Sequence, residues 1–418
     1  MIVILRSVYT ERLNFEQENF KPKQKEPRIH LTMKGKILAC AATILLGLST
    51  CAVSASGRQD LSLTRIGVER GLSNNHVVGI VQDKQGFIWV ATDEGLNRFD
   101  GHNFRTFFKE EQSARGSITG NELNCILDDP RLPVLWIGTA RAGLNAYDYE
   151  KDEFTAYSHD PSDPSSLITD DVTHVAPAAD GGIWVSTFWR GIDHLDPKTG
   201  KFTHFNASTV KGMPDASVWT MTDGGDGFLY VAHEHHGLTV IDVRHMTARN
   251  FMPDPKRQDA LPSANISCVY KDSMSNIWVG SDAGLSLFDC EEGSFVDFSR
   301  YHPALRHKVS DMRQFSDNRL WIAMERGGLA SMGLGDSIFS SPVMAEVTSI
   351  PSGKGKGMLS SPSVRSICQD RYDNIWAGTW GGGVNLISGN MPAFRLHAVS
   401  PFSSVTSART YVSPSWKL

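Results

Sequence analysis

The stretch that decides the fold is His76-Val-Val-Gly-Ile-Val-Gln-Asp-Lys-Gln-Gly-Phe-Ile-Trp-Val-Ala-Thr-Asp-Glu-Gly-Leu-Asn-Arg-Phe-Asp100. It reads as three short strands separated by turns: an apolar run that ends at Asp83, the aromatic and β-branched run Phe87–Ala91, and then Leu96–Phe99. A fourth strand is expected around Phe104. Together these runs predict one four-stranded antiparallel sheet.

Three turn signals separate the strands of this stretch. Gln85-Gly86 tolerates a positive φ and predicts a two-residue hairpin between the first and second strands. Gly95 predicts a turn with positive φ before the third strand. The third strand ends at Asp100, whose carboxylate can cap a turn against its own backbone.

The same pattern returns seven times between Leu72 and Ile387. Its marker is an aromatic residue with apolar neighbours, at spacings of 47, 48, 46, 48, 43 and 55 residues. A period of roughly 40–50 residues is the length of one propeller blade. The seven markers are Trp89, Trp136, Trp184, Tyr230, Trp278, Trp321 and Trp376. We therefore predict an all-β fold, a single seven-bladed β-propeller with four antiparallel strands per blade.

The repeated residues are interpreted as structural. An aromatic side chain at the same place in every blade most simply packs blade against blade, and its replacement by alanine should cost about 3–5 kcal/mol. The repeated acidic residues are interpreted as turn caps rather than metal ligands: Asp100, Asp148, Asp196, Asp242 and Asp289.

A propeller must close, because an open stack of blades would expose sheet edges and apolar faces. The segment Leu61–Ile66 precedes the first repeat and alternates with period two. We expect it to form the outer strand of the last blade, so that the N-terminal strand closes the ring. Ala393–His397 is the alternative for that position.

The N-terminal region indicates export. Residues 1–32 are polar and are interpreted as a mis-assigned gene start, while residues 33–55 are typical of a signal peptide with a small-residue cleavage site at Val53-Ser-Ala55. We therefore expect a periplasmic protein whose propeller occupies residues 56–390. The segment before Cys51 also resembles a lipoprotein box, so a lipid anchor at Cys51 is the alternative.

The charge balance limits the class of partner. The chain has a formal net charge of −5, and residues 37–418 hold 33 basic and 42 acidic residues, which is −9. An acidic domain without a basic stripe argues against binding of nucleic acid or of anionic membrane surfaces. We expect no nucleic-acid partner for this chain.

Nothing in the sequence indicates a metal, a cofactor or a disulfide framework. His233-Glu-His-His236 is not an H-E-x-x-H motif, because Gly237 takes the place of the second histidine. The cysteines beyond the signal region lie in four different blades and form no CxxC pair. They are Cys125, Cys268, Cys290 and Cys368.

The turns between the second and third strands are the candidate ligand site, because they open on the same face as the link into each blade. Tryptophan faces stack on sugar rings, and an arginine fork pairs with carboxylate or sulfate. We therefore predict a site for a sugar or an acidic glycan. The candidate residues are Glu94, Arg141, Trp189, Arg190, His235, His236, Asp282, Glu325, Arg326 and Trp380.

Two alternatives to ligand sensing stay open. The first is a secreted propeller enzyme, a lyase or glycosidase, that uses His235 or His236 with the nearby Glu234. The second is a protein-interaction scaffold without a small ligand. Because no catalytic motif accompanies the histidines, we expect no enzymatic activity in this chain.

The repeat resembles a known family. Gly71–Val77, Gln82–Thr92 and Glu94–Asp100 are similar to the two-component regulator propeller repeat, and Ile375–Gly383 in the last copy is a second strong match. The resemblance covers residues 61–390. It implies the periplasmic sensor region of a hybrid two-component histidine kinase of Bacteroides-type bacteria, with oligosaccharides as ligands.

The resemblance also bears on the C-terminal end. In such proteins two consecutive propellers precede a small β-sandwich, a membrane helix, a kinase, a receiver and a DNA-binding domain, none of which is recognisable here. Phe394–Pro401 mirrors Phe154–Pro161. We therefore interpret residues 391–418 as the start of a truncated second propeller. The expected protein partner is a second propeller or a second copy, with membrane attachment only through a missing C-terminal segment or a lipid anchor.

Overall fold

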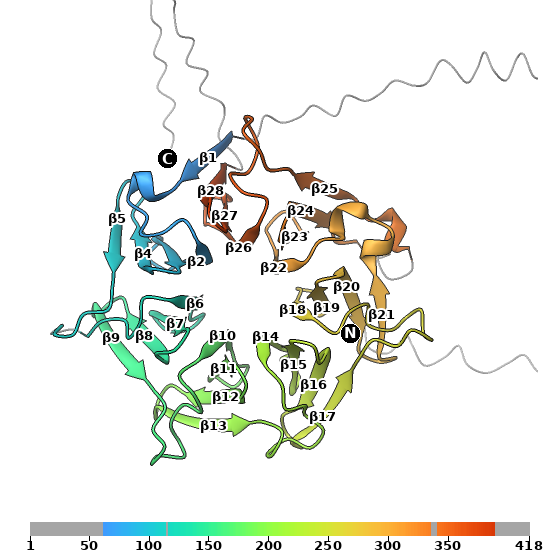
Figure 1. Ribbon diagram of the computed structural model, residues 1–418, viewed down its shortest axis with the longest axis horizontal. Helices are drawn as coiled ribbons and strands as arrows, with labels where there is room; N and C mark the ends of the chain where they lie inside the picture. The colour runs from blue at the N-terminus through green and yellow to red at the C-terminus, as the bar shows by residue number, and fades with distance from the viewer. Residues whose placement is uncertain (1–61, 114–115, 336–340, 389–418) are drawn as a thin grey trace, which may run out of the picture. The chain divides into compact units, whose positions relative to one another are not determined.

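The computed structural model describes residues 62–113, 116–335 and 341–388, which form seven four-stranded antiparallel sheets. The first strand of each sheet contacts that of the next, and the last sheet contacts the first, so the blades close into a ring (Figure 1). The predicted seven-bladed propeller is thereby confirmed. The predicted signal peptide, the lipid anchor and the C-terminal tail lie outside the described residues.

Each blade runs from an inner first strand to an outer fourth strand. Blades 1 to 3 comprise β2 (Val77–Gln82), β3 (Ile88–Thr92), β4 (Gly95–Phe99) and β5 (Phe104–Phe107); β6 (Leu123–Asp128), β7 (Val134–Thr139), β8 (Leu144–Asp148) and β9 (Glu153–Tyr157); β10 (Val172–Pro177), β11 (Ile183–Thr187), β12 (Gly191–Asp196) and β13 (Lys201–Phe205). Blades 4 and 5 comprise β14 (Val218–Asp223), β15 (Phe228–His233), β16 (Leu238–Asp242) and β17 (Thr247–Phe251); β18 (Ile266–Lys271), β19 (Ile277–Ser281), β20 (Gly284–Asp289) and β21 (Ser294–Asp297). Blades 6 and 7 comprise β22 (Val309–Gln314), β23 (Arg319–Met324), β24 (Gly328–Gly333) and β25 (Val347–Ile350); β26 (Val364–Gln369), β27 (Ile375–Thr379), β28 (Gly383–Ser388) and β1 (Ser62–Ile66). Four short 3-10 helices are η1 (Val68–Arg70), η2 (Phe298–Arg300), η3 (Pro303–Leu305) and η4 (Pro342–Met344).

Strand β1 closes the ring, as predicted. It pairs antiparallel with β28, from Ser62 opposite Ser388 to Ile66 opposite Val384. The Arg65 side chain adds a hydrogen bond from Nε to the Gly382 carbonyl at 3.1 Å. The N-terminal strand therefore supplies the outer strand of blade 7, the place that the alternative segment 393–397 would have taken.

The repeated aromatic residues pack between neighbouring blades, as predicted. Trp89 of blade 1 lies in one apolar cluster with Leu135 and Ile137 of blade 2. Trp376 of blade 7 lies with Val77 and Val90 of blade 1, which carries the packing across the closure. Neighbouring blades are thus held together by the burial of apolar side chains between their sheets.

An aspartate at the end of the first strand fixes most of these indoles, a role that the sequence did not suggest. Asp83 accepts hydrogen bonds from the Gly86 and Phe87 amides on Oδ1 and from the Trp89 indole on Oδ2, at 2.7, 2.9 and 2.6 Å. One buried carboxylate therefore holds both a hairpin and the blade-packing side chain. The equivalent indole bonds elsewhere are Trp136 to Asp129, Trp278 to Asp272 and Trp376 to Asp370.

The predicted two-residue hairpin between the first two strands is wrong. Three residues lie between Asp83 and Phe87. The Asp83 amide donates to the Phe87 carbonyl at 3.0 Å, and this bond closes the turn. The Asp83 cap accounts for the extra residue, because its carboxylate binds two amides of the turn. Positive φ falls on the third turn residue, which is Gly86, Gly181, Gly227, Ser275, Asn318 or Asp373.

The other two turn predictions are confirmed. Gly95 has a φ of 95°, and its equivalents in all blades are also positive: Gly143, Gly191, Gly237, Gly284, Gly328 and Gly383. The Asp100 carboxylate accepts from the amides of His102 and Asn103 at 2.8 and 2.7 Å. These backbone bonds lower the pKa of Asp100.

In blade 3 a charged pair binds the segment that precedes β10. Asp193 is fully buried, accepts from the Ile168 amide at 2.7 Å, and lies 2.6 Å from His204 Nδ1. His204 Nε2 lies 2.9 Å from the Pro164 carbonyl. Both ring nitrogens thus face acceptors, an arrangement that favours the protonated imidazole, and the Asp193 carboxylate raises the pKa of His204.

Raising the pH should weaken the propeller through His204. Because the folded-state pKa is raised, the stabilisation is complete below the unfolded-state pKa of about 6.5 and is lost as the pH rises through the folded-state pKa. We expect a loss of about 1.5 kcal/mol, the contribution of one charge-assisted hydrogen bond. Urea unfolding across this pH window should show a steeper decline for wild type than for His204→Gln; parallel profiles would contradict the assignment.

Candidate functional site

A cavity of about 1110 Å³ occupies the centre of the ring and is lined by the first strand of every blade. The strands that line it, which Figure 1 shows nearest the centre of the ring, are β2, β6, β10, β14, β18, β22 and β26. One end of the cavity lies at the turns that join the second and third strands of each blade. We call this end the mouth. The first strand of each blade begins, and the second ends, at this mouth.

A β-bulge in each first strand points one side chain into the cavity. The ladder shifts by one between the first and third residues, as between Val77 and Gly79 in blade 1. The skipped residue of every blade lines the cavity: Val78, Asn124, Thr173, Trp219, Ser267, Ser310 and Arg365. The side chain at this position differs in chemistry between blades, while the register shift recurs in every blade.

Trp219 is the prominent member of this set, and the sequence reasoning missed it. Its side chain lines the cavity and is 41% exposed. Its ring centroid lies 5.9 Å from that of Phe188, tilted by 57°, and Phe188 in turn lies 5.1 Å from Trp189. The available signal was an indole at a position where other blades carry small or polar residues.

Trp189 extends this aromatic group away from the cavity. It is 61% exposed and has a φ of 70°, a conformation that a bulky residue rarely adopts. The equivalent position of blade 7 is Gly381, also with positive φ. An exposed indole held in a strained turn is a feature found at binding surfaces.

Trp380 lines the cavity, but its ring faces are already in contact with protein groups. His76 stacks on it with a centroid separation of 4.3 Å and an interplanar angle of 10°. The Arg365 guanidinium lies 5.4 Å from its ring centroid. Trp380 is nonetheless 45% exposed, so both cavity tryptophans keep ring surface for stacking, and Trp219 differs in lying against the tilted Phe188 ring rather than under a stacked imidazole.

Polar groups of blades 4 and 5 line the mouth of the same cavity. Glu234, His235, Asn265 and Asp282 all line the cavity. Asn265 accepts from the His235 amide at 3.0 Å and donates to Asp282 Oδ2 at 2.9 Å, so it fixes both neighbouring turns. His235 Nε2 is 3.9 Å from Glu234 Oε1, beyond hydrogen-bond distance, so the two do not form an oriented acid–base pair.

Blades 6 and 7 present a paired set of charges. Lys308 Nζ and Arg365 Nη1 both lie against Glu325 Oε1, at 3.1 and 3.0 Å. Deeper in the cavity, Arg313 Nη1 lies 3.1 Å from Asp311 Oδ1. The cations that line the cavity are thus each tied to a carboxylate.

Two buried histidines near the cavity are neutral. Burial lowers the pKa of His174 to about 3, helped by the positive charge of Arg313. Burial also lowers the pKa of His233, the last residue of β15, to about 4. Within residues 62–113, 116–335 and 341–388, no group of three or more His, Cys, Asp or Glu side chains is arranged to hold a metal, and the four cysteines are free thiols.

The predicted site residues divide into two groups. His235, Asp282, Glu325 and Trp380 line the cavity. The others lie in the predicted turns but are not part of its lining: Glu94, Arg141, Trp189, Arg190, His236 and Arg326. The residues that sequence reasoning missed are Trp219, Asn265, Lys308 and Arg365, which lie in or beside the first strands.

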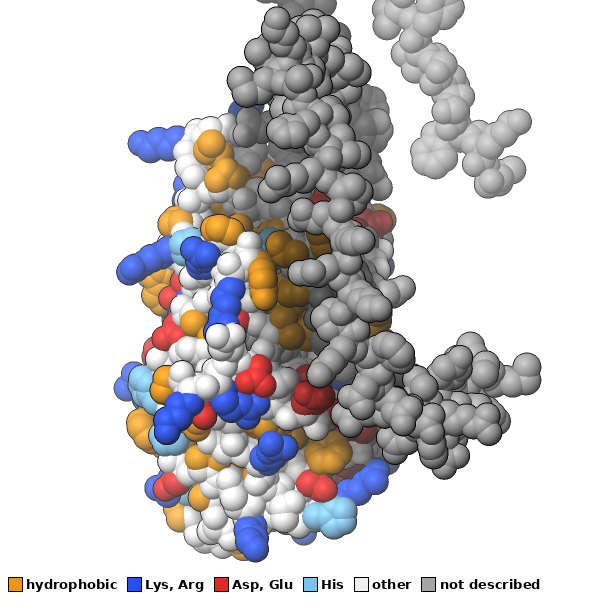
Figure 2. Space-filling view, turned by 90° about the vertical axis from the view of Figure 1, so that its right-hand side faces the viewer, with side chains coloured by type: hydrophobic (Ala, Val, Ile, Leu, Met, Phe, Trp, Pro, Cys, Tyr) orange, Lys and Arg blue, Asp and Glu red, His pale blue; other side chains and the backbone are white. Residues whose placement is uncertain are grey.

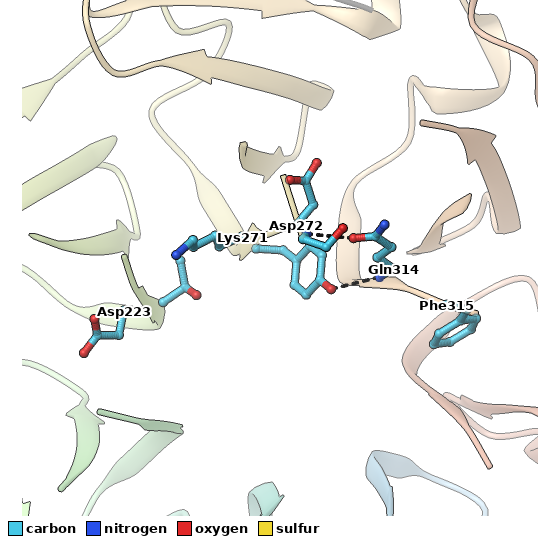
Figure 3. Close-up of a pocket in the computed structure, with 8 residues that line it drawn as sticks. Asp223, Lys271, Asp272, Gln314 and Phe315 are labelled. Atoms are coloured by element: carbon cyan, nitrogen blue, oxygen red, sulfur yellow. Dashed lines mark hydrogen bonds between the residues drawn. The ribbon is translucent and has the colours of Figure 1, made fainter. Parts of the chain in front are cut away.

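The opposite edge of the sheets has a second hollow, of about 600 Å³, in which polar groups join blades (Figure 3). The Ser273 amide donates to Gln314 Oε1 at 2.8 Å, and the Gln314 amide donates to the Tyr270 hydroxyl at 3.0 Å. Lys271 Nζ donates to the Gly224 carbonyl of blade 4. Because these groups already bind neighbouring blades, we assign this edge a structural role.

Family comparison supports the repeat assignment. Residues 71–94, 260–283 and 358–381 match the family model described as two component regulator propeller. They cover the first two strands of blades 1, 5 and 7. The chain therefore carries repeats of the two-component regulator propeller family.

Solved structures extend the comparison. An extracellular domain assigned to a hybrid two-component system of B. thetaiotaomicron is 44% identical with a TM-score of 0.71, over 79% of this chain and 42% of that chain. A second such domain from the same organism is 19% identical with a TM-score of 0.62, over 79% and 40%. Virginiamycin B lyase from Staphylococcus aureus is 13% identical with a TM-score of 0.57, over 79% and 100%, and shows the fold alone.

The curated proteins give a shorter match. Histidine kinase P4 of Formosa agariphila is 54% identical over 37 residues, which is 9% of this chain and 3% of that protein. The chain thus spans less than half the length of the two-component relatives it matches. Over most of its length it is similar in sequence to the extracellular domain of a hybrid two-component system. Among the residues that the structure describes, no helix is long and apolar enough to cross a bilayer.

Proposed function

We propose that this chain is the ligand-binding propeller of a periplasmic two-component sensor and that it binds an oligosaccharide at the mouth, against blades 3 to 5. The observation that carries the proposal is the Trp219 ring, 41% exposed inside the cavity. Glu234 and Asp282 lie in the same lining. Sugar rings stack on aromatic faces, while carboxylates accept hydrogen bonds from hydroxyl groups.

The arrangement of the cavity supports a small ligand over a purely structural scaffold. A volume of about 1110 Å³ is ample for a short oligosaccharide, since ligand cavities commonly measure about 300–1,000 Å³. Phe188 and Trp189 continue the aromatic surface outward from Trp219. A chain of several sugars could therefore begin in the cavity and leave along blade 3.

We further propose that residues 33–55 direct export to the periplasm and that the bound state is passed on through contacts with a second propeller or a second copy. The 44% identical extracellular domain supports this proposal. That chain is more than twice as long as the part matched here, which leaves ample sequence for such a partner domain.

Removing the Trp219 ring should abolish most of the oligosaccharide binding. We expect Trp219→Ala to weaken affinity about 10- to 100-fold, equivalent to about 1.4–2.7 kcal/mol, because the sugar loses its stacking surface. Isothermal titration calorimetry of the purified propeller against oligosaccharides released from plant and host polysaccharides would measure it.

Two control variants make this test specific. Trp219→Phe should retain part of the affinity, and the thermal midpoint of Trp219→Ala should stay close to wild type because the ring is exposed. Trp189→Ala should weaken only longer oligosaccharides. Undiminished binding by Trp219→Ala would refute the site, and product release by the wild-type protein would favour an enzyme.

A further inference from the structure

The carboxylates at the mouth outnumber the cations. Asp93, Glu122, Glu234, Asp282 and Glu325 line this end of the cavity. The two basic side chains that line it, Lys308 and Arg365, both lie within 3.1 Å of Glu325. This cluster of two cations and one carboxylate carries a formal charge of +1, so with the other four carboxylates the lining of the mouth carries a formal charge of −3, a surplus of negative charge.

Glu234 and Asp282 form the centre of this surplus. Among the described residues neither pairs with a lysine or an arginine: Glu234 has only His235 at 3.9 Å, and Asp282 accepts from the Asn265 amide nitrogen at 2.9 Å. Both line the same cavity as Trp219. A ligand in this cavity would meet two carboxylates that no lysine or arginine of the described residues pairs with.

The arginines that suggested an acidic glycan lie elsewhere. Arg141, Arg190 and Arg326 are not part of the cavity lining. Arg141 is also 83% exposed and lies 3.8 Å from Glu122, a separation at which the pair contributes little. The charge at the site is therefore opposite to the one that the turn sequences indicated.

We propose that the mouth binds a neutral oligosaccharide and discriminates against uronate and sulfated sugars, with Glu234 and Asp282 as the specificity-determining residues. The inference rests on the proposed oligosaccharide binding and names its chemical class. A neutral sugar offers hydroxyl donors to both carboxylates, whereas an added anionic group is repelled by them in a partly desolvated site. Discrimination through like-charge repulsion weakens as salt screens the charges.

The test uses oligosaccharides that differ only in charge. Uronic-acid oligosaccharides and their carboxyl-reduced counterparts, together with uncharged plant oligosaccharides, are titrated into the purified chain by calorimetry. For each backbone that binds, the reduced form should bind at least about tenfold more tightly, a difference of about 1.4 kcal/mol. The ratio should shrink at high salt.

Isosteric variants link this ratio to the two residues. In Glu234→Gln with Asp282→Asn, the neutral sugar should lose affinity and the uronate should gain, so that the ratio falls toward one. The matched control is Glu291→Gln, an exposed carboxylate in the turn between β20 and β21 at the far edge of the sheet, which should leave the ratio unchanged. Circular dichroism and thermal unfolding verify that each variant is folded.

The outcomes separate the two proposals. If no oligosaccharide of either kind binds, the proposed function fails. If uronates bind as tightly as their reduced forms or more tightly, sugar binding stands and the neutral class is refuted. In that case loss of binding in Arg313→Gln would place the anion on the deeper guanidinium, which keeps 47% of its side chain exposed.

Discussion

Trp278→Ala should lower the free energy of unfolding by about 3–5 kcal/mol, because it removes a large fully buried side chain and leaves a cavity between blades 5 and 6. The indole packs in one cluster with Val309 and Leu320 of blade 6. Its Nε1 also donates to Asp272 Oδ2 at 2.9 Å, so the variant leaves that buried carboxylate one donor short. Urea unfolding followed by far-UV circular dichroism would measure the change.

The repeat itself supplies the matched control for this prediction. Trp321 occupies the same place in blade 6 but is only half-buried, and its Nε1 bonds to Asp317 at 3.0 Å near solvent. Trp321→Ala should therefore cost clearly less than Trp278→Ala. Equal losses for the two variants would show that repeat position, rather than burial, sets the energy.

Deleting residues 62–66 should have an effect at least as large, about 5 kcal/mol or more, because it opens the ring. The deletion removes the whole ladder with β28, the buried side chain of Ile66 and the Arg65 bond to Gly382. It also exposes an apolar sheet edge that can pair with another chain. We expect a lower thermal midpoint and concentration-dependent association by light scattering.

A peptide complement distinguishes ring closure from general damage. A synthetic peptide of residues 60–68 should restore the thermal midpoint of the shortened chain, while the same peptide with Thr64→Pro should not, since proline removes a ladder hydrogen bond. A shortened chain that stays monomeric with an unchanged midpoint would show that β1 is dispensable for closure.

The repeat made most of the fold predictable. Each blade carries its own strand alternation, turn glycine and capping aspartate within fewer than 60 residues, so local chemistry repeated seven times identifies both the strands and their number. The hairpin was predicted one residue too short, because Gln85-Gly86 has the composition of a complete two-residue turn. The cap that lengthens this turn is Asp83, whose second oxygen binds an indole.

The candidate site was only partly predictable. The mouth turns could be located, and His235, Asp282 and Trp380 do reach the cavity. Trp219 stands out in the sequence only as an indole where other blades carry small or polar residues, because its direction depends on the bulge between Val218 and Thr220, which the sequence does not mark. Nor does a turn sequence say which turn residue faces the axis.

The sequence by itself thus determined the class of fold, the blade count and the closing strand, since these follow from short-range patterns that each blade satisfies within itself. Only the tertiary structure decided the character of the site. Trp219, Asn265 and Asp282 belong to different strands and turns, and Glu325 pairs with Lys308 and Arg365 from two blades. The ring geometry brings these residues together, because each first strand faces the same axis and each bulge turns one side chain toward it.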